Sequence, residues 1–437
     1  MSGALQVVFQ NLRSFGFGDW ILTLTGSTAN TMDITADSSG NVYANGSTAG
    51  SPNTDGFLVK VKSDGTVLAK KTITGSDYEA LDSAEVDSSG NIFLFGYNIP
   101  SGVGQGQALV MKLNSSYNIT WQNKFEYVPY ANDEDPATGG IDSSGNVYFA
   151  YGFYGGSNRR GVVVKLASNG GLQYSNSFYA SNSIDTYVRH ASADSSGNLY
   201  VNITNLNNSP FDIRQLTLKV DNAGGVVWNR TLYASGEYVS AGEGQSIAVD
   251  SSGNVYVVGR SNYSASGGYT TGFVAKYNSS GTIQWQRVLY SASKSLSLEG
   301  VAVDALGNVY AVGGDQTNNR GVVFKYNSSG SLQWQKQLYY TGASNAIRGC
   351  IVSGSYIYLA GYISSALTGS TIFKLGTDGT GTGTYGSWTY ADNNYTDVAG
   401  NLTDASFAYT FNGIEAGSTS TSLSIGNKTL TETLTTF

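Results

Sequence analysis

The sequence predicts an all-β protein made of seven tandem units, each with four short strands. Two motifs carry this prediction, because both return about every 50 residues and always in the same order. The 437 residues contain only five prolines and no long amphipathic helical pattern, which agrees with a chain of short strands and tight turns. Internal repetition at such an interval is the signature of repeat architectures.

The first motif is a turn of the pattern D-x-x-G-N. It begins at Asp37, Asp87, Asp142, Asp194, Asp250 and Asp304, and a degenerate seventh copy begins at Val352. The Asp side chain can accept hydrogen bonds from backbone N–H groups two residues further on, and Gly tolerates the positive φ of a tight hairpin turn. Each copy therefore predicts a hairpin between two strands of its unit, capped by its own Asp and free of bound metal.

The second motif places a lysine four or five residues before a glycine, and usually a tryptophan four residues after that glycine. The lysines are Lys60, Lys112, Lys165, Lys219, Lys276, Lys325 and Lys374, and the aromatic position holds Trp121, Tyr174, Trp228, Trp285 and Trp334. In the fifth unit the strands delimited in this way are SIAVD, NVYVVGR, TGFVAKYN and IQWQRVLY. β-branched and aromatic runs between turn residues are typical of strands.

Four-stranded units at this interval are typical of propeller blades, which stack radially so that each sheet buries both faces against its neighbours. The predicted fold is therefore a seven-bladed β-propeller over residues 19–385. Trp20 opens WILTLTG, which resembles the fourth strand of a unit, and the seventh unit has Gly383 where the tryptophan is expected. We expect this N-terminal strand to complete the last blade and close the ring, with Trp388 as the competing candidate.

The segments outside the repeats differ from them in character. Residues 1–18 form an apolar segment that neither the repeat nor the closing strand requires, so we expect it to anchor the protein to other proteins through Phe9, Phe15 and Phe17. Residues 386–437 are rich in Ser and Thr and contain a hairpin signal at Asn412. They predict a small C-terminal β appendage or arm, which is the alternative point of attachment.

Composition argues against several classes of function. Charged residues make up 13% of the chain and the net charge is −7, so the cationic excess that non-specific nucleic-acid binding needs is missing. The chain has no run of eighteen apolar residues, so we expect no membrane insertion. With one cysteine and one histidine, we expect no metal site, no cofactor and no catalytic residue, and we expect Cys350 and His190 to be structural.

The two faces of the predicted ring differ. The turns between first and second strands and between third and fourth strands share one face and are uniform, whereas the other connections vary in length and sequence. Variable loops on a rigid scaffold usually carry specificity. The candidate ligand-binding residues in these loops are Tyr154, Arg159, Arg160, Tyr263 and Tyr269. The alternative is that they are solvated loop residues without a ligand.

The repeated unit resembles a known family. The sequence EGVAVDALGNVYAVGG, followed by GVVFKYNSSGSLQWQKQLY, resembles the bacterial β-propeller repeat with its D-x-x-G-N-x-Y-x-x-G and K-x-x-x-x-G-x-x-x-W patterns, over about residues 19–380. This resemblance implies a fold and no activity. The opening SGALQVVFQNLRSFG looks like an N-terminal segment of structural proteins of tailed bacteriophages, particularly those that infect cyanobacteria.

Together these resemblances imply a bacteriophage virion structural protein without enzymatic activity. We expect a propeller on the tail or capsid that is bound to other virion proteins and that contacts a host surface glycan or protein. Such a particle assembles in the host cytoplasm and is released by lysis, which agrees with an N-terminus unlike a signal peptide. The first alternative is a secreted or surface bacterial propeller that binds carbohydrate or protein. The second is a glycan-cleaving propeller, disfavoured because no S-x-D-x-G-x-T-W box or catalytic acid pair is present.

Overall fold

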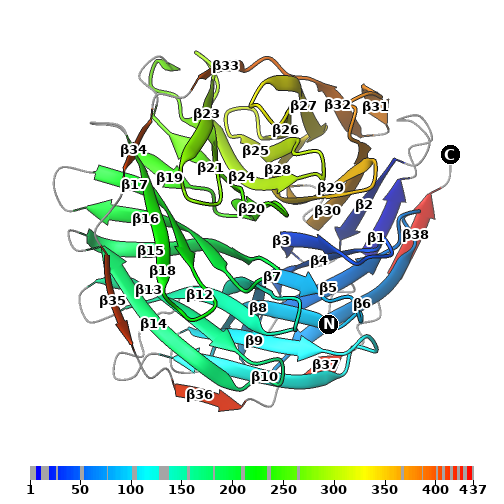
Figure 1. Cartoon of the computed structure of the whole chain (residues 1–437). Coiled ribbons are helices and arrows are strands. Elements are labelled where there is room, and N and C mark those ends of the chain that lie inside the picture. Colours follow the sequence, from blue (N-terminus) through cyan, green and yellow to red (C-terminus); the bar gives the residue numbers. More distant parts are fainter. Residues whose placement is uncertain are drawn as a thin grey trace.

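Seven antiparallel sheets are arranged in a ring around a central axis (Figure 1). The computed structural model describes residues 6–10, 19–25, 28–49, 54–75, 77–100, 106–126, 137–154, 158–180, 183–207, 212–233, 238–262, 266–365, 369–385, 387–399, 402–405, 409–413, 417–420, 424–426 and 431–435. The regular elements of these residues are β-strands. The predicted all-β, seven-bladed propeller is therefore confirmed.

Each blade has four strands in chain order from the axis outward. Blade 1 is β3 (Thr28–Ala36), β4 (Val42–Ala49), β5 (Asp55–Val61) and β6 (Val67–Thr74), and blade 2 is β7 (Tyr78–Val86), β8 (Ile92–Ile99), β9 (Gln107–Leu113) and β10 (Ile119–Glu126). Blade 3 is β11 (Thr138–Ile141), β12 (Val147–Tyr154), β13 (Arg159–Leu166) and β14 (Leu172–Ala180), and blade 4 is β15 (Ser183–Ala193), β16 (Leu199–Asn207), β17 (Asp212–Val220) and β18 (Val226–Tyr233).

The remaining blades follow the same order. Blade 5 begins with two short strands, β19 (Val239–Ala241) and β20 (Ile247–Val249), and continues with β21 (Val255–Ser261), β22 (Thr271–Tyr277) and β23 (Ile283–Tyr290). Blade 6 is β24 (Leu296–Val303), β25 (Val309–Asp315), β26 (Arg320–Tyr326) and β27 (Leu332–Tyr340). Blade 7 takes β28 (Ala343–Ser353), β29 (Tyr356–Ser365) and β30 (Gly369–Gly376) from the end of the repeats.

The fourth strand of blade 7 is β2 (Trp20–Thr25), from the other end of the repeats. It pairs antiparallel with β30, with Trp20 opposite Lys374. The predicted closure by the N-terminal strand is therefore confirmed. Trp388 begins β32 (Trp388–Asp392), which pairs with β27 of blade 6, so the competing candidate is wrong. The edge of β30 is already taken by β2, and β32 pairs with the free edge of the neighbouring blade instead.

The D-x-x-G-N turns satisfy their own polar groups. In blade 5, Asp250 Oδ1 accepts the backbone N–H groups of Ser252 and Asn254 at 2.9 Å each, and Oδ2 accepts the Asn254 amide at 2.8 Å and the Tyr256 hydroxyl at 2.9 Å. Gly253 has φ +75°. The turns at Asp37, Asp142, Asp194 and Asp304 repeat these contacts. Self-capping, as predicted, explains the motif.

Replacing Gly253 by Val should destabilise the protein by about 1–3 kcal/mol, because a β-branched residue is strained at positive φ. Its Cβ would also lie 3.2 Å from Ser279 Cβ. Ser252→Ala, at an exposed position of the same turn, should be nearly neutral. Urea unfolding of both variants measures the difference, and equal losses would contradict this turn geometry.

The lysine and tryptophan of the second motif join neighbouring blades. In blade 5, Lys276 Nζ and Trp285 Nε1 both donate to the Ser328 carbonyl in a turn of blade 6, at 3.4 and 3.1 Å. The same pair of donors bonds blade 2 to blade 3 and blade 6 to blade 7. Across the closure, Lys374 and Trp20 donate to the Ser63 carbonyl of blade 1. The lysine and the tryptophan of the repeated motif therefore supply the hydrogen bonds that join one blade to the next.

Both ends of the chain add strands to the outside of the ring: the N-terminal end adds β1, and the C-terminal end adds a series of short strands. β1 (Gln6–Gln10) pairs antiparallel with β2. β31 (Gly383–Tyr385) forms a hairpin with β32. From β32 the chain continues around the ring in the reverse order of the blades, as β33 (Thr396–Ala399), β34 (Thr403–Ala405), β35 (Tyr409–Gly413), β36 (Gly417–Ser420), β37 (Ser424–Gly426) and β38 (Thr431–Thr435). We call the seven strands β32–β38 the belt; it is the orange-to-red chain around the rim in Figure 1.

Each belt strand pairs with a different blade. β32 to β37 pair antiparallel with the fourth strands of blades 6, 5, 4, 3, 2 and 1, and β38 pairs parallel with β1 beside blade 7. The sequence predicted a C-terminal β appendage or arm, and the described residues form the strands of an arm that extends along the outer edges of the blades. The fourth strands of blades 1 to 6 each offer an outer edge to a belt strand, and in blade 7 β1 offers it. A short polar strand needs no core of its own when it pairs with such an edge.

The structure describes only part of the predicted N-terminal anchor segment, residues 6–10. Phe9 lies in β1, in register with Leu22 of β2, so this part of the segment belongs to blade 7 and is not separate from the propeller. Phe15 and Phe17 lie outside the described residues. Strand pairing with β2 supplies the role for residues 6–10 that the repeat pattern did not require.

Candidate functional site in the centre of the ring

The innermost strands carry a β-bulge at one repeated position. In β28 the register moves from Ile347 opposite Gly361 to Gly349 opposite Ala360, which leaves Arg348 unpaired. The same shift leaves Met32, Asp82, Arg189 and Glu299 unpaired in β3, β7, β15 and β24. In blade 5 the bulge is enlarged to residues 242–246, between β19 and β20. A bulge re-aims a side chain, and most of these residues line the two central cavities described below.

The second glycine of the repeat, D-x-x-G-N-x-Y-x-x-G, makes room for this bulge. A Cβ atom on Gly313 would lie 2.0 Å from the Ser297 carbonyl oxygen of the neighbouring strand. Gly46 is in the same position, 2.0 Å from the Asn30 carbonyl oxygen. The motif therefore fixes where a side chain turns toward the axis, and the residue at the bulge is free to vary.

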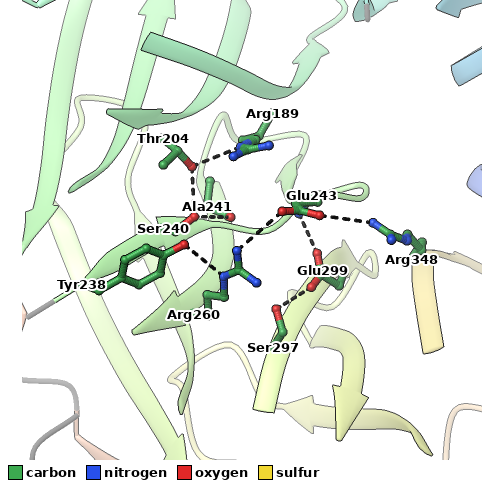
Figure 2. A network of polar contacts seen from close by, with 10 residues as sticks. All are labelled: Arg189, Thr204, Tyr238, Ser240, Ala241, Glu243, Arg260, Ser297, Glu299 and Arg348. Carbon is green, nitrogen blue, oxygen red and sulfur yellow. Dashed lines mark hydrogen bonds and ion pairs between the residues drawn. The ribbon is translucent and has the colours of Figure 1, made fainter. Parts of the chain in front are cut away.

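Glu243, in the enlarged bulge of blade 5, connects three blades (Figure 2). Its carboxylate lies 3.5 Å from Arg260 Nη2 and 3.7 Å from Arg348 Nη1, and its backbone N–H donates to Glu299 Oε2 at 2.6 Å. Arg260 also donates to the Tyr238 hydroxyl at 3.2 Å. The Glu243 side chain is 41% exposed, so these pairs add little stability. Their charged groups remain open to a ligand.

A cavity of about 180 Å³ lies beside this network, and we call it the mouth cavity. Its lining includes Glu243, Arg260, Glu299, Asp315, Arg348 and Tyr362. It opens where first strands begin and second strands end, which is the face of the variable loops. The Arg348 guanidinium lies 5.8 Å from the centre of the half-buried Tyr362 ring. The mouth cavity therefore combines both charge signs with an aromatic wall.

A second cavity of about 200 Å³, the inner cavity, lies nearer the axis. It is lined by Met32, Asp82, Thr138, Val188, Arg189, His190, Glu243, Gly244 and Arg348. Burial lowers the pKa of His190 to about 4, so its ring is neutral at physiological pH. Burial raises the pKa of Asp82 to about 7, although the nearby Arg348 opposes this rise.

Four of the predicted residues, Tyr154, Arg159, Arg160 and Tyr269, lie on the same face but outside both cavities. The Arg159 guanidinium lies 5.0 Å from the ring centres of Tyr154 and Tyr187, and Arg160 lies 4.6 Å from that of Tyr179. The Tyr269 carbonyl accepts a hydrogen bond from the Ser266 hydroxyl. Tyr263 lies outside the described residues. The structure brings Tyr154 and Arg159 together at the rim and leaves Tyr269 apart.

Sequence reasoning missed the central residues, although a signal exists. The bulge position is five residues before the first residue of the turn motif in the first six units, and four residues before Val352 in the seventh. It holds Met32, Asp82, Ala137, Arg189, Gln245, Glu299 and Arg348. Four of these seven are charged, namely Asp82, Arg189, Glu299 and Arg348. Alignment of the units on their turns reveals this position, whereas a search for loops does not.

His190 and Cys350 are both buried, at 5% and 0% exposure, and burial raises the pKa of the Cys350 thiol. Within the described ranges, no group of three or more His, Cys, Asp or Glu side chains is arranged to hold a metal ion. The described part of the chain also has no helix long and apolar enough to cross a membrane.

Acidification from pH 8 to pH 5 should raise the melting temperature. Burial raises the pKa of Asp19 to about 6. Burial also raises the pKa values of Glu79, Asp82 and Glu85 to about 7. Unfolded carboxyls titrate near 4, so the folded state binds more protons in this window and stability falls as pH rises through it, by up to about 1.4 kcal/mol per group and pKa unit.

His190 opposes this trend, because its folded pKa of about 4 lies below the unfolded value near 6.5 and its contribution is lost on acidification. Four carboxyls outweigh one imidazole. Thermal melts across this pH range measure the result, and Asp82→Asn should flatten the slope. A melting temperature that rises from pH 5 to pH 8 would contradict the assignment.

Comparison with known proteins agrees with this architecture. Residues 231–263, from the end of blade 4 into blade 5, match the family model of the beta-propeller repeat. No curated protein matches the sequence. The fold, with its central cavities, therefore defines a β-propeller that carries at least one recognisable repeat of this kind.

The chain is similar in structure to several solved proteins at low identity. They include the polysaccharide lyase Uly1 (11% identity, TM-score 0.48, covering 79% of this chain and 90% of that one) and Sqt1 from Chaetomium thermophilum (10%, 0.41, 86% and 99%). A mutant of puromycin hydrolase complexed with PGG is similar over 84% of this chain and 54% of that one (12%, 0.41). None of these similarities says anything about activity.

Proposed function

We propose that this propeller is a non-catalytic recognition protein whose ligand binds at the mouth cavity, on the face of the variable loops. The observation that carries the proposal is the exposed network of Glu243, Arg260 and Arg348. Arg260 lies in the second strand β21 and Arg348 in the innermost strand β28, and both hold Glu243 in the bulge between β19 and β20, so little ordering is needed on binding. The uniform turns of the opposite face offer no comparable variation.

Binding without catalysis suits the state of the carboxylates. Glu299 Oε2 accepts the Glu243 N–H, and its other oxygen accepts the Ser297 hydroxyl. Glu243 faces two guanidinium groups. Hydrolysis of a glycan needs one protonated and one ionised carboxyl placed across a bond, and these two carboxyls are both held as acceptors. The mouth cavity is therefore suited to hydrogen bonding and charge recognition.

The setting that we favour is a bacteriophage virion, with the propeller on the tail or capsid and a host surface glycan or protein as its ligand. The N-terminal resemblance supports this setting. Other virion proteins would be its partners, through the N-terminal segment or the belt. A secreted or surface bacterial propeller is the second candidate, favoured by the repeat match at residues 231–263. Both candidates use the same recognition site. They differ in whether a phage particle or a bacterial cell displays the propeller.

The test is binding of the labelled protein to cyanobacterial cells and to an array of bacterial polysaccharides. Tyr362→Ala should reduce binding at least tenfold, because it removes the aromatic wall of the mouth cavity. Gln333→Ala, on the opposite face, should leave binding unchanged. Equal binding of the two variants would overturn the site, and release of reducing ends from a bound polysaccharide would overturn the non-catalytic assignment.

The virion setting has its own test. Purified phage particles should contain the chain, and a variant lacking residues 1–17 should fold with β2 in place yet fail to join the particle. Normal incorporation of that variant would move the attachment to the belt. Absence of the chain from particles, together with its presence on bacterial cells, would favour the second candidate.

A further inference from the structure

Polar atoms without partners gather in the inner cavity. Among the described residues, neither ring nitrogen of His190 has a hydrogen-bond partner, although the side chain is 5% exposed. Thr138 Oγ1, Asp82 Oδ2 and Arg348 Nε are in the same condition. Leaving a buried polar group unpaired costs about 1–3 kcal/mol. Four such side chains lining one cavity indicate a site built for a polar molecule.

The charges around the cavity disfavour a ligand with a net charge. An anion would meet the carboxyls of Asp82 and Glu243, and a cation would meet the guanidinium groups of Arg189 and Arg348. Glu243 and Arg348 already face each other at 3.7 Å. The lining as a whole therefore favours a ligand without net charge.

The unpaired atoms call for groups that both donate and accept hydrogen bonds. A neutral imidazole has one donor and one acceptor nitrogen, and the Thr138 hydroxyl can do both. Asp82 supplies an acceptor and Arg348 a donor. A hydroxyl group is the common ligand group that satisfies either kind of partner. Several hydroxyls on one small ring would match several of these atoms together.

Size and apolar surface narrow the class further. A cavity of about 150 Å³ can hold a molecule of the size of benzene, so the inner cavity of about 200 Å³ has room for a somewhat larger ring. Met32 and Val188 add an apolar wall, against which the C–H face of a ring can pack. We propose that the inner cavity binds a neutral, polyhydroxylated molecule of the size of one sugar ring. This site goes beyond the proposed function. It shares Glu243 and Arg348 with the mouth cavity, but its other lining residues, among them Met32, Asp82, Thr138 and His190, belong to blades that the mouth cavity does not use.

The chain contains a built-in reporter of this site, since His190 is its only histidine. In full-length protein with isotope-labelled histidine, the imidazole signals belong to one residue. The probes are the methyl glycosides of glucose, galactose and mannose, with inositol as a non-glycosidic polyol, and phosphate and choline as charged controls. At least one neutral probe should shift the His190 signals in a saturable way, and the charged controls should leave them in place.

Matched variants separate binding in the cavity from binding elsewhere. Thr138→Val keeps the side-chain shape and removes the hydroxyl, and should weaken the binding of the active probe about three- to tenfold. Gln333→Ala, on the far face, should leave the affinity unchanged. The proposal is overturned if no neutral probe shifts His190, if phosphate or choline shifts it equally, or if Thr138→Val has no effect. Cell binding that still depends on Tyr362 would then leave the proposed function standing.

Discussion

Deleting residues 1–26 should lower the melting temperature of the whole propeller by on the order of 10 °C. The deletion removes β2 and with it the buried side chains of Trp20, Ile21, Leu22 and Leu24. Burial of each is worth about 1.5–3 kcal/mol. It also exposes the edge of β30 and breaks the Trp20 contact with the Ser63 carbonyl of blade 1. Blade 7 then contacts blade 1 mainly through β28, β29 and β30, without the apolar side chains of β2 between the two blades.

Thermal unfolding of this variant should be compared with that of the variant lacking residues 1–17. The shorter deletion removes β1 and keeps the closing strand, so its melting temperature should fall much less. Identical melts of the two variants would contradict closure by β2.

Replacing Trp388 by Ala should destabilise the protein by about 3–5 kcal/mol, the usual cost of removing a buried tryptophan. Trp388 is 1% exposed. Its ring meets Phe373 of blade 7 edge-on at 4.9 Å and Tyr340 of blade 6 at 5.3 Å. The first belt strand thereby fills the gap between two blades.

Chemical denaturation of Trp388→Ala measures this contribution. Thr396→Ala is the matched control, because Thr396 is an exposed residue of the next belt strand and should be neutral within about 0.5 kcal/mol. Equal stability of the two variants would show that the belt adds nothing to the ring. Tyr395 and Leu402 are buried at 3% and 4%, so the belt has further apolar contacts beyond β32.

The propeller could be predicted from the sequence because its signals are local and repeated. The Asp250 turn is capped within six residues, and the Trp285 contact recurs wherever its motif recurs. Closure could be predicted for the same reason, since Trp20 opens a copy of a known strand. The belt could not be predicted, because its strands pair with blade edges up to several hundred residues away in the sequence. The belt sequence also contains no pattern that indicates which edge each strand pairs with.

The central site was missed for a different reason. Arg348 and Glu299 lie inside strands and not in the variable loops where candidate residues were expected, and only the bulge turns them toward the axis. A bulge is a change of register between two strands, and the sequence does not show strand register. In an alignment of the repeats, its only sign is a charged residue at a position where an apolar one is expected. Tyr154 and Arg159 were predicted because they fall in connections of variable length and sequence. Such variation identifies a binding residue less reliably than the same position in every repeat does.

The reverse path of the belt makes the protein tolerant of being cut. A protease that cleaves between blades 3 and 4 divides the chain into two fragments, each with blades of its own. The N-terminal fragment still contributes β2 to blade 7, and the C-terminal fragment still contributes β35, β36 and β37 to blades 3, 2 and 1. Each fragment therefore holds strands of the other. A single nick between these blades leaves the two pieces joined by backbone hydrogen bonds.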